Sequence, residues 1–155
     1  MPYRFRHAVD VRFKDVDIGG HAHHSHALVY MEEARAAYWR EVVGRPGLED
    51  IDYILAEARV RYRARVLYPQ RLEVAVRVSR LSRRRFDMEY EVRGAGGEVL
   101  VEGSTVQVMY DYRKGVSKAV PDDVRTAMEK LDGPFGRGGL PVEGPTAADR
   151  DAADM

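Results

Sequence analysis

The chain has 155 residues, of which 45% are hydrophobic and 32% are charged. This length corresponds to one domain, and the composition is that of a globular protein rather than a collagen-like or disordered chain. No cysteine is present, which excludes thiol nucleophiles, thiolate metal sites and disulfides and permits a cytoplasmic location. Lys plus Arg and Asp plus Glu both total 25, so bulk charge gives no reason to expect nucleic acid as a partner.

The sequence also gives no sign of a membrane partner. Its longest apolar run, residues 27–31, is far shorter than the roughly 18 residues that a membrane span requires. The N-terminal segment has no continuous apolar stretch after its positive charges, so we expect no secretory signal. A cytoplasmic protein is therefore the expectation.

The first half of the chain predicts a strand, a loop and a long helix. Residues 7–13 alternate between apolar and polar side chains, as in a half-buried strand that turns Val9, Val11 and Phe13 to one side. Residues 14–26 contain two Asp, two Gly and four His, a composition typical of a loop. Ser25 is a candidate N-cap. From Leu28 to Val42 apolar residues recur every three or four positions, and Gly44 and Pro46 end this pattern.

The second half predicts four strands and a short helix. Strong alternation occurs over residues 58–66, 72–78 and 86–92, and a further strand is expected over 99–110 with a bulge at Gly103. The arginines at 59, 61, 63 and 65 fall on one face of the first of these strands, where we expect them to pair with Asp87, Glu89 and Glu91. Residues 124–131 predict a helix that opens after Pro121.

This element order predicts an α+β fold with a five-stranded antiparallel sheet, one long helix and a short C-terminal helix. Residues 1–132 would form the domain. Gly, Pro, Asp and Ala dominate residues 133–155, which predicts a mobile tail. Because the sheet leaves unprotected edges, we expect self-association as a homodimer or a dimer of dimers.

Residues 11–35 are the segment most suggestive of chemistry. Asp17 precedes two glycines and the start of the long helix. A carboxylate at that place lies beside backbone N–H groups that are unpaired in the first helical turn and that suit a developing oxyanion. Asp17 would then be a base or a nucleophile. The alternative is that Asp15 and Asp17 only stabilise turns in a glycine-rich loop.

The same segment resembles hot-dog fold thioesterases of the 4-hydroxybenzoyl-CoA thioesterase type. The motif of that family, Asp-x-Asp-x-x-Gly followed by a helix with Glu-x-Ala-Arg, matches Asp15, Asp17 and Gly20 and then Glu32 or Glu33 with Ala34 and Arg35. The resemblance extends over residues 7–131. It implies the hot-dog arrangement, in which the sheet wraps around the long helix.

The resemblance further implies hydrolysis of acyl-CoA or acyl-carrier thioesters, with Asp17 as nucleophile or as general base for water. The family's oxyanion donor, a backbone N–H at the helix start, corresponds to His24, whose side chain would help to orient substrate or water. Coenzyme A would be part of the substrate, and no cofactor is expected. The positions expected to line the substrate site are Gly20, His21, His23 and Ala27.

Two clusters of cations are candidates for the phosphates of coenzyme A, which lie at one rim of the sheet in the family. Arg83, Arg84 and Arg85 precede one strand, and Arg113 and Lys114 follow the last. No glycine-rich phosphate loop is present, so cationic side chains would have to bind the phosphates. The alternative is that these are solvated basic turns.

Three hypotheses follow for the function: an acyl-CoA thioesterase, a hot-dog protein that binds acyl-CoA or an acyl carrier without turnover, and a metal-dependent hydrolase. The third would use His21, His23, His24 and His26 with the aspartates. We expect no metal, because ligands crowded into so short a loop do not readily converge on one ion.

Overall fold

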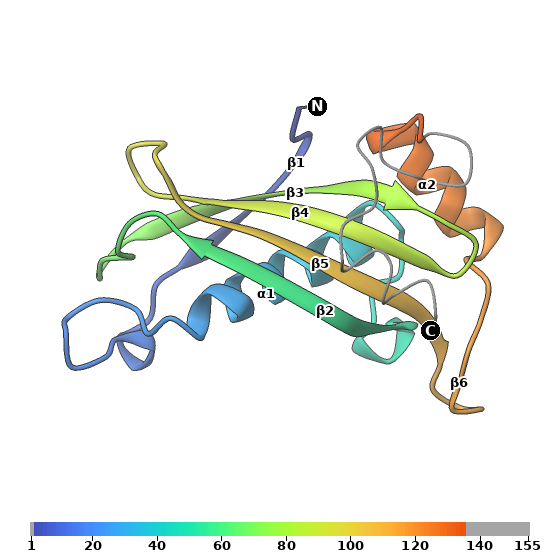
Figure 1. Cartoon of the computed structure of the whole chain (residues 1–155), viewed down its shortest axis with the longest axis horizontal. Coiled ribbons are helices and arrows are strands. Elements are labelled where there is room, and N and C mark those ends of the chain that lie inside the picture. The colour runs from blue at the N-terminus through green and yellow to red at the C-terminus, as the bar shows by residue number, and fades with distance from the viewer. Residues whose placement is uncertain (1, 136–155) are drawn as a thin grey trace. The chain divides into compact units, whose positions relative to one another are not determined.

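The computed structural model describes residues 2–135 and contains two helices and six strands in that range. Figure 1 labels them in chain order: β1 (Phe5–Asp10), α1 (His26–Glu41), β2 (Tyr53–Tyr62), β3 (Arg71–Leu81), β4 (Arg85–Arg93), β5 (Val99–Asp111), β6 (Val116–Ser117) and α2 (Asp122–Asp132). Single turns of 3-10 helix occur at Phe13–Asp15 and Leu48–Asp50.

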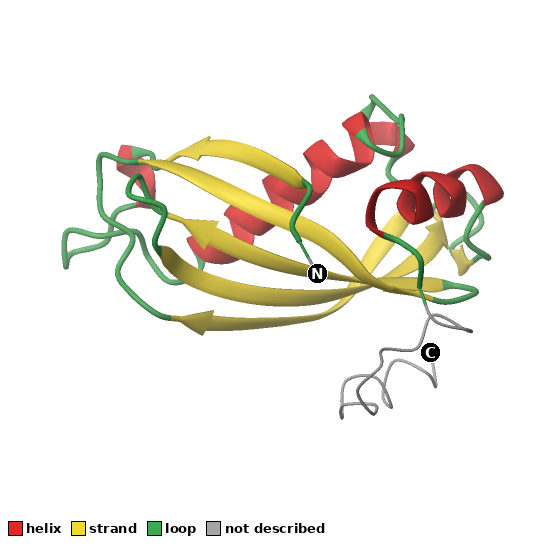
Figure 2. Cartoon of the chain, turned by 90° about the horizontal axis from the view of Figure 1, so that it is seen from above, coloured by secondary structure: helices red, strands yellow, loops and turns green. Residues whose placement is uncertain are grey.

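The strands form one curled sheet in the order β1-β3-β4-β5-β2, and β6 pairs with β5. β1 lies antiparallel to β3, with Phe5 opposite Val76 and Asp10 opposite Arg71. Figure 2 distinguishes the strands, in yellow, from the helices, in red. The predicted α+β class, with an antiparallel sheet, one long helix and a short C-terminal helix, is confirmed.

The chain forms two compact units, each assembled from three segments. The first unit contains residues up to 38, 59–77 and 89–104, and the second contains residues 39–58, 78–88 and 105 onward. Both units include part of α1 and parts of several strands.

In the first unit, the N-terminal three turns of α1 bury one broad face. Tyr30, Met31 and Tyr38 are fully buried, and the Tyr38 ring meets the Phe5 ring edge-on at 5.4 Å. Buried Arg35 donates a hydrogen bond of 3.1 Å to the hydroxyl of Tyr90 on β4. Each large side chain buried in this way contributes about 1.5–3 kcal/mol, so the start of the helix is held firmly in this unit.

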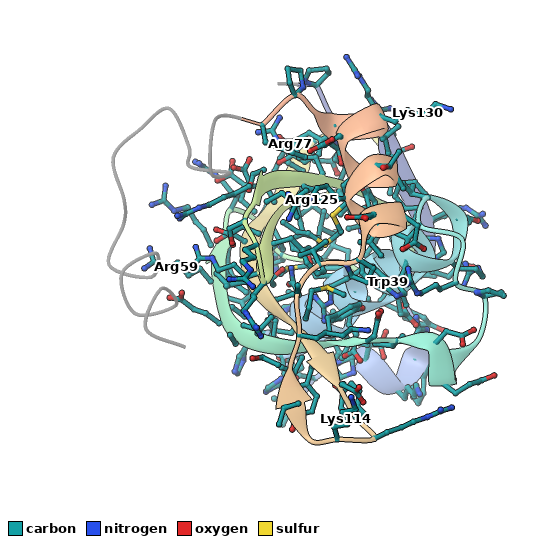
Figure 3. The ribbon with its side chains drawn as sticks, turned by 90° about the vertical axis from the view of Figure 1, so that its right-hand side faces the viewer. Trp39, Arg59, Arg77, Lys114, Arg125 and Lys130 are labelled. Carbon is teal, nitrogen blue, oxygen red and sulfur yellow. The ribbon has the colours of Figure 1, made fainter. Side chains whose placement is uncertain are left out.

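In the second unit, the core is aromatic. Trp39 stacks on Phe86 with ring centroids 5.5 Å apart, and Tyr53 meets both rings edge-on. α2 is joined to β3 by a hydrogen bond of 2.9 Å from the Val78 N–H to Asp132. Arg125 of α2, labelled in Figure 3, donates to the Ser82 carbonyl.

The structure corrects several predicted boundaries. β1 ends at Asp10, and Phe13 lies in a 3-10 turn with 79% of its surface exposed. β2 begins at Tyr53, before the start of the strand predicted over residues 58–66, and ends at Tyr62. Residues 53–57 read Tyr-Ile-Leu-Ala-Glu, so the alternation that indicates a strand is missing there. Leu28 of α1 is 41% exposed, although the helical pattern places it with the core residues.

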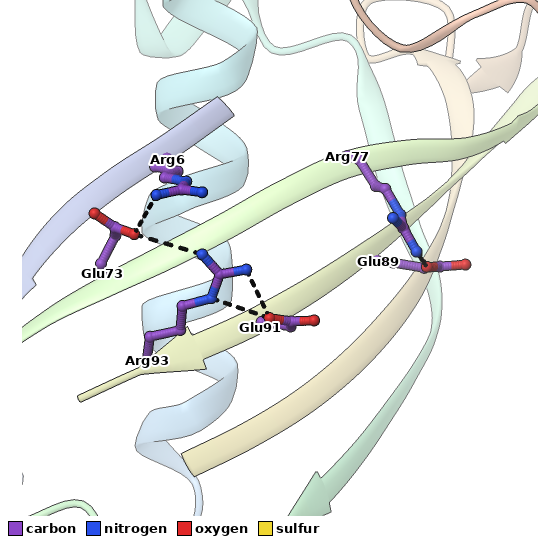
Figure 4. Close-up of polar contacts among 6 residues, drawn as sticks. All are labelled: Arg6, Glu73, Arg77, Glu89, Glu91 and Arg93. Atoms are coloured by element: carbon purple, nitrogen blue, oxygen red, sulfur yellow. Dashed lines mark hydrogen bonds and ion pairs between the residues drawn. The ribbon is translucent and has the colours of Figure 1, made fainter. Parts of the chain in front are cut away.

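The predicted ion pairs of the arginine row are also wrong. Glu89 pairs with Arg77 of β3, and Glu91 pairs with Arg93 of its own strand, which also contacts Glu73 (Figure 4). Asp87 likewise lies 3.4 Å from Arg85. In the sheet order β2 borders β5 and not β4, so these carboxylates find their partners on β3 and β4.

Among the residues that the structure describes, no helix is long and apolar enough to cross a membrane. The predicted tail falls mostly on residues 136–155, which lie outside the described range. The bulge at Gly103 stays a prediction.

Gly103 is required by the close approach of α1. A Cβ at this position would lie 2.6 Å from the Met31 sulfur and 3.3 Å from the Arg59 carbonyl oxygen. We therefore expect Gly103→Ala to lower the free energy of unfolding by about 1–3 kcal/mol through overpacking, measured by urea denaturation. Met31→Ala provides space for the new methyl group. The double variant should therefore lose less free energy of unfolding than the sum of the losses in the two single variants. Strict additivity would contradict this origin.

Candidate functional site

A cavity of about 350 Å³ lies in the first unit, within the size range of small-molecule sites. Four segments form it: the loop before α1, the first turns of α1, the chain at the end of β2 and just beyond it, and the start of β5. The lining residues are Asp17, His21, Ala22, His23, His24, Ala27, Tyr30, Tyr62, Arg63, Ala64, Arg65, Val66 and Val101.

Asp17 lies in a tight loop and is one of the residues that line this cavity. Its backbone N–H donates to the His21 carbonyl at 2.9 Å, and its carbonyl accepts from the Gly20 N–H. Its Oδ1 accepts a hydrogen bond of 2.8 Å from the Gly19 N–H. Gly20 has φ +82°, a left-handed conformation that glycine adopts without steric cost. The motif in which Gly20 follows Asp17 thus has a structural reason, because the glycine allows the chain to close this loop.

Asp15, the other carboxylate of the motif, is buried and serves a different purpose. Only 1% of its surface is exposed. Its Oδ2 accepts hydrogen bonds from the Arg12 N–H at 3.0 Å and from the Tyr30 hydroxyl at 2.8 Å. The Nε2 atom of His26 lies 3.1 Å from Oδ1, and the Asp15 carbonyl accepts from the His23 N–H. Asp15 therefore joins the 3-10 turn, the site loop and α1.

The pKa values of Asp15 and Tyr30 shift in opposite directions at this buried contact. Burial by itself would raise the pKa of Asp15, but the hydrogen bonds from Arg12 and Tyr30 and the positive charge of His26 outweigh it and leave the pKa below its usual value. Burial, followed by the hydrogen bond to the Asp15 carboxylate, raises the pKa of Tyr30 well above its usual value. Asp15 is thus a permanent anion, and Tyr30 a permanent donor, at neutral pH.

The backbone at His24 is arranged to leave one donor available. The His24 carbonyl accepts a hydrogen bond of 2.6 Å from the Tyr62 hydroxyl of β2, which fixes this peptide beside the cavity. The His24 N–H donates to no other group in the described part of the chain. It precedes α1, whose N-terminal end carries a partial positive charge. A substrate oxygen in the cavity could accept from this N–H.

The four histidines separate into two groups. His21, His23 and His24 line the cavity, and the rings of His23 and His24 lie 4.0 Å apart. His26 instead pairs with buried Asp15. Ser25, the candidate N-cap, uses its hydroxyl to bond His23 Nδ1 at 2.8 Å. Within residues 2–135 no three His, Asp or Glu side chains are grouped closely enough to hold a metal ion.

The predicted phosphate-binding cations lie in the second unit, whereas the cavity belongs to the first. Arg83 and Arg84 are exposed in the turn between β3 and β4, and Arg84 bonds Ser117 at 3.2 Å. Arg85 is only 6% exposed and pairs with Asp87. Lys114 lies at the tip of the turn after β5 (Figure 3), and the N–H groups of Arg113 and Lys114 both donate to Asp111.

Sequence reasoning missed the segment that closes the cavity on its other side. Tyr62, Arg63, Arg65 and Val101 all line it. The alternation over 58–66 predicts one continuous strand with its arginines on an outer face, but β2 ends at Tyr62. Beyond that point the chain turns toward the site loop, where the Ala22 N–H donates to the Val66 carbonyl at 2.8 Å. No signal in the sequence marks this turn.

Comparison with known proteins shows which family the chain belongs to. The model of the thioesterase-like superfamily matches residues 11–128. A thioesterase from Thermus thermophilus, whose structure was determined in complex with coenzyme A and zinc, is 31% identical, with a TM-score of 0.74 over 82% of this chain and 98% of that one.

Two further relatives support the fold. A predicted thioesterase from Bacillus stearothermophilus is 20% identical, with a TM-score of 0.76 over 85% of this chain and 98% of its own. The uncharacterized protein YsmA of Bacillus subtilis is 21% identical over 126 residues, which are 81% of this chain and 86% of that protein. The predicted hot-dog fold is confirmed by these likenesses.

We expect Asp15→Asn to lower the free energy of unfolding by roughly 1–3 kcal/mol at pH 7, because the amide removes a buried charged acceptor. Since the pKa of Asp15 is lowered in the folded state, its contribution is present above the usual carboxyl pKa and is lost as the pH falls through the lowered value. Urea denaturation of both proteins across this acid range should show the difference shrinking.

Asp10→Asn is the matched control, because Asp10 is 68% exposed at the side chain and lies 3.7 Å from Arg71. Exposed pairs of this kind contribute little. Equal stability of the Asp15 variant and the wild type at pH 7 would contradict the role given to this carboxylate.

Proposed function

Because the chain belongs to the thioesterase-like superfamily, we propose that it hydrolyses acyl thioesters of coenzyme A to the free acid and the thiol. The observation that carries this proposal is one cavity lined by both Asp17 and His24, whose backbone N–H has no partner among the described residues. A nucleophilic or basic oxygen and an oxyanion donor are the two groups that acyl transfer requires.

Asp17 acts in one of two ways. As nucleophile, its carboxylate oxygen attacks the thioester carbon to form a tetrahedral intermediate, and the C–S bond breaks, which expels the thiolate and leaves a mixed anhydride. Water then hydrolyses the anhydride to the free acid and the Asp17 carboxylate, and the proton released from water passes to the thiolate. As general base, it takes a proton from water while the water oxygen attacks the same carbon; the thiolate leaves and the proton passes to it. Both routes consume one water and yield one acid and one thiol.

The His24 N–H would stabilise the negative charge that develops on the carbonyl oxygen in either route. The hydrogen bond from Tyr62 to the carbonyl of the same residue holds the His24 backbone in place, and preorganised donors of this kind need no reorientation during the reaction. The His24 imidazole would orient substrate or water. Gly20 shapes the loop, and His21, His23 and Ala27 would contact the acyl group.

Coenzyme A as the thiol is supported by the Thermus thermophilus relative, which was crystallised with it. An acyl-carrier thioester would present the same reacting group. The zinc in that structure is a specific reason to test metal dependence, so a chelator belongs in every assay. A protein that only binds acyl-CoA would give no thiol release under any condition.

We also propose that the protein is a homodimer or a dimer of dimers and that it is located in the cytoplasm. β2 is the last strand of the sheet order, and its residues Ile54, Leu55 and Tyr62 are exposed. Apolar side chains on an edge strand favour association with a second copy. Sedimentation would measure the resulting mass.

Asp17→Asn should fold normally and lose most of its turnover, by roughly two orders of magnitude or more in kcat, because the amide keeps the shape but neither attacks nor takes a proton. Thiol release from a panel of CoA esters, with and without a chelator, measures this. Wild-type rates in the variant would refute the mechanism, and chelator-sensitive turnover would favour the metal-dependent alternative.

Removing Arg83 and Arg84 together, each to Ala, should raise KM for CoA esters and leave kcat nearly unchanged, because phosphate contacts bind substrate and transition state equally. Arg85 is left in place, because it is buried and pairs with Asp87, so that its removal would disturb the fold. Salt should raise KM in the wild type, with a screening length near 10 Å at about 0.1 M.

An N-acetylcysteamine thioester, which lacks the nucleotide, is the control and should respond neither to the substitutions nor to salt. If KM for the CoA ester and its salt response stay unchanged in the double variant, Arg83 and Arg84 form a solvated turn. The phosphates would then have to be sought near Arg113 and Lys114.

A further inference from the structure

Arg65 is the cation of the cavity that has no counterion. It lies beyond the end of β2 and lines the cavity together with Asp17. Its side chain forms no ion pair or hydrogen bond with any residue in the described range. Its neighbour Arg63 lines the same cavity but is neutralised by Glu102, 2.8 Å away. The positive charge of Arg65 is therefore available to a ligand.

The backbone around Arg65 is held on both sides. The N–H groups of Arg63 and Ala64 both donate to the Leu100 carbonyl, at 2.8 and 3.1 Å. On the other side, the Val66 carbonyl accepts from the Ala22 N–H, and Val66 is buried. A cation on an anchored backbone loses less conformational freedom when it binds a ligand than one on a free loop.

Part of the cavity lining is apolar. Ala22, Ala27, Ala64, Val66 and Val101 supply apolar surface. A carboxylate that leaves water for such surroundings needs a compensating partner. A guanidinium compensates best, because it binds a carboxylate through two parallel charge-assisted hydrogen bonds.

We infer that the substrate is a thioester whose acyl group carries a second carboxylate, which Arg65 binds. This inference rests on the proposed thioesterase function and specifies its substrate class. The phosphates of coenzyme A are the less suitable anions. The long pantetheine arm separates them from the thioester carbon, whereas Arg65 and Asp17 line one cavity of only about 350 Å³. A cavity of this volume suits an acyl group with a short carbon chain.

The test compares adipoyl-CoA with hexanoyl-CoA, which differ only in a terminal carboxylate in place of a methyl group. The wild type should have the higher kcat/KM for adipoyl-CoA. Arg65→Gln should lower the ratio of the two kcat/KM values by roughly ten- to one hundred-fold, the range expected for losing a charge-assisted hydrogen bond. Arg65→Lys, which keeps the charge but not the two-pronged geometry, should retain part of the preference.

Arg61→Gln is the matched control, because Arg61 is an exposed arginine of β2 that does not line the cavity. It should leave the ratio unchanged. A loss of activity by Arg65→Gln that is equal for both esters, or an unchanged ratio, would overturn the inference. An equal loss that disappears with N-acetylcysteamine thioesters would assign Arg65 to a coenzyme A phosphate instead.

Binding separates this inference from the proposed function. Calorimetric titration of the two esters into Asp17→Asn should give tighter binding of adipoyl-CoA, and the difference should vanish in Asp17→Asn combined with Arg65→Gln. If the wild type hydrolyses neither ester, the thioesterase proposal fails while this binding difference still tests Arg65. If Asp17→Asn binds both esters equally, the assignment of Arg65 is wrong.

Discussion

The buried carboxylate of Asp15 is the interaction on which the candidate site depends. It accepts from the Arg12 N–H and the Tyr30 hydroxyl and lies beside His26, so it ties a 3-10 turn to the first two turns of α1. The adjoining peptide accepts from the His23 N–H. A charged acceptor without these donors would be costly to bury. The donors therefore fix where the loop with Asp17 begins and where it returns to the helix.

Once the loop is fixed at both ends, its geometry follows from a few local bonds. The Asp17 N–H and the His21 carbonyl close it, and the left-handed Gly20 makes the turn without strain. The cavity then needs a second wall, which comes from a distant part of the chain. Tyr62 reaches the His24 carbonyl, and Val66 accepts from Ala22. The backbones of Asp17 and His24 are thus each held by hydrogen bonds, which suits the roles that we propose for them, because electrostatic catalysis requires preorganised groups.

Charge is distributed unevenly over the arginine-rich first unit. On β3 and β4, Arg77 and Arg93 are matched by Glu89, Glu91 and Glu73 (Figure 4). Such pairs keep an outer sheet face hydrated and contribute little individually. In the cavity, Arg63 has Glu102 while Arg65 has no partner within the described residues. That contrast distinguishes an arginine available for recognition from arginines that balance the surface.

The sequence by itself determined the element order, the antiparallel sheet and the long helix, because alternation and helical spacing are local properties. Only the tertiary structure decided that Asp15 is a buried anchor rather than a turn residue, that β2 begins at Tyr53 and that Arg65 faces the cavity. It also decided that Arg85 is buried against Asp87. Periodicity tells which side of a strand a residue occupies, but not which strand lies beside it or where the strand ends. Those depend on contacts between residues far apart in the chain, such as Tyr62 with His24 and Tyr30 with Asp15.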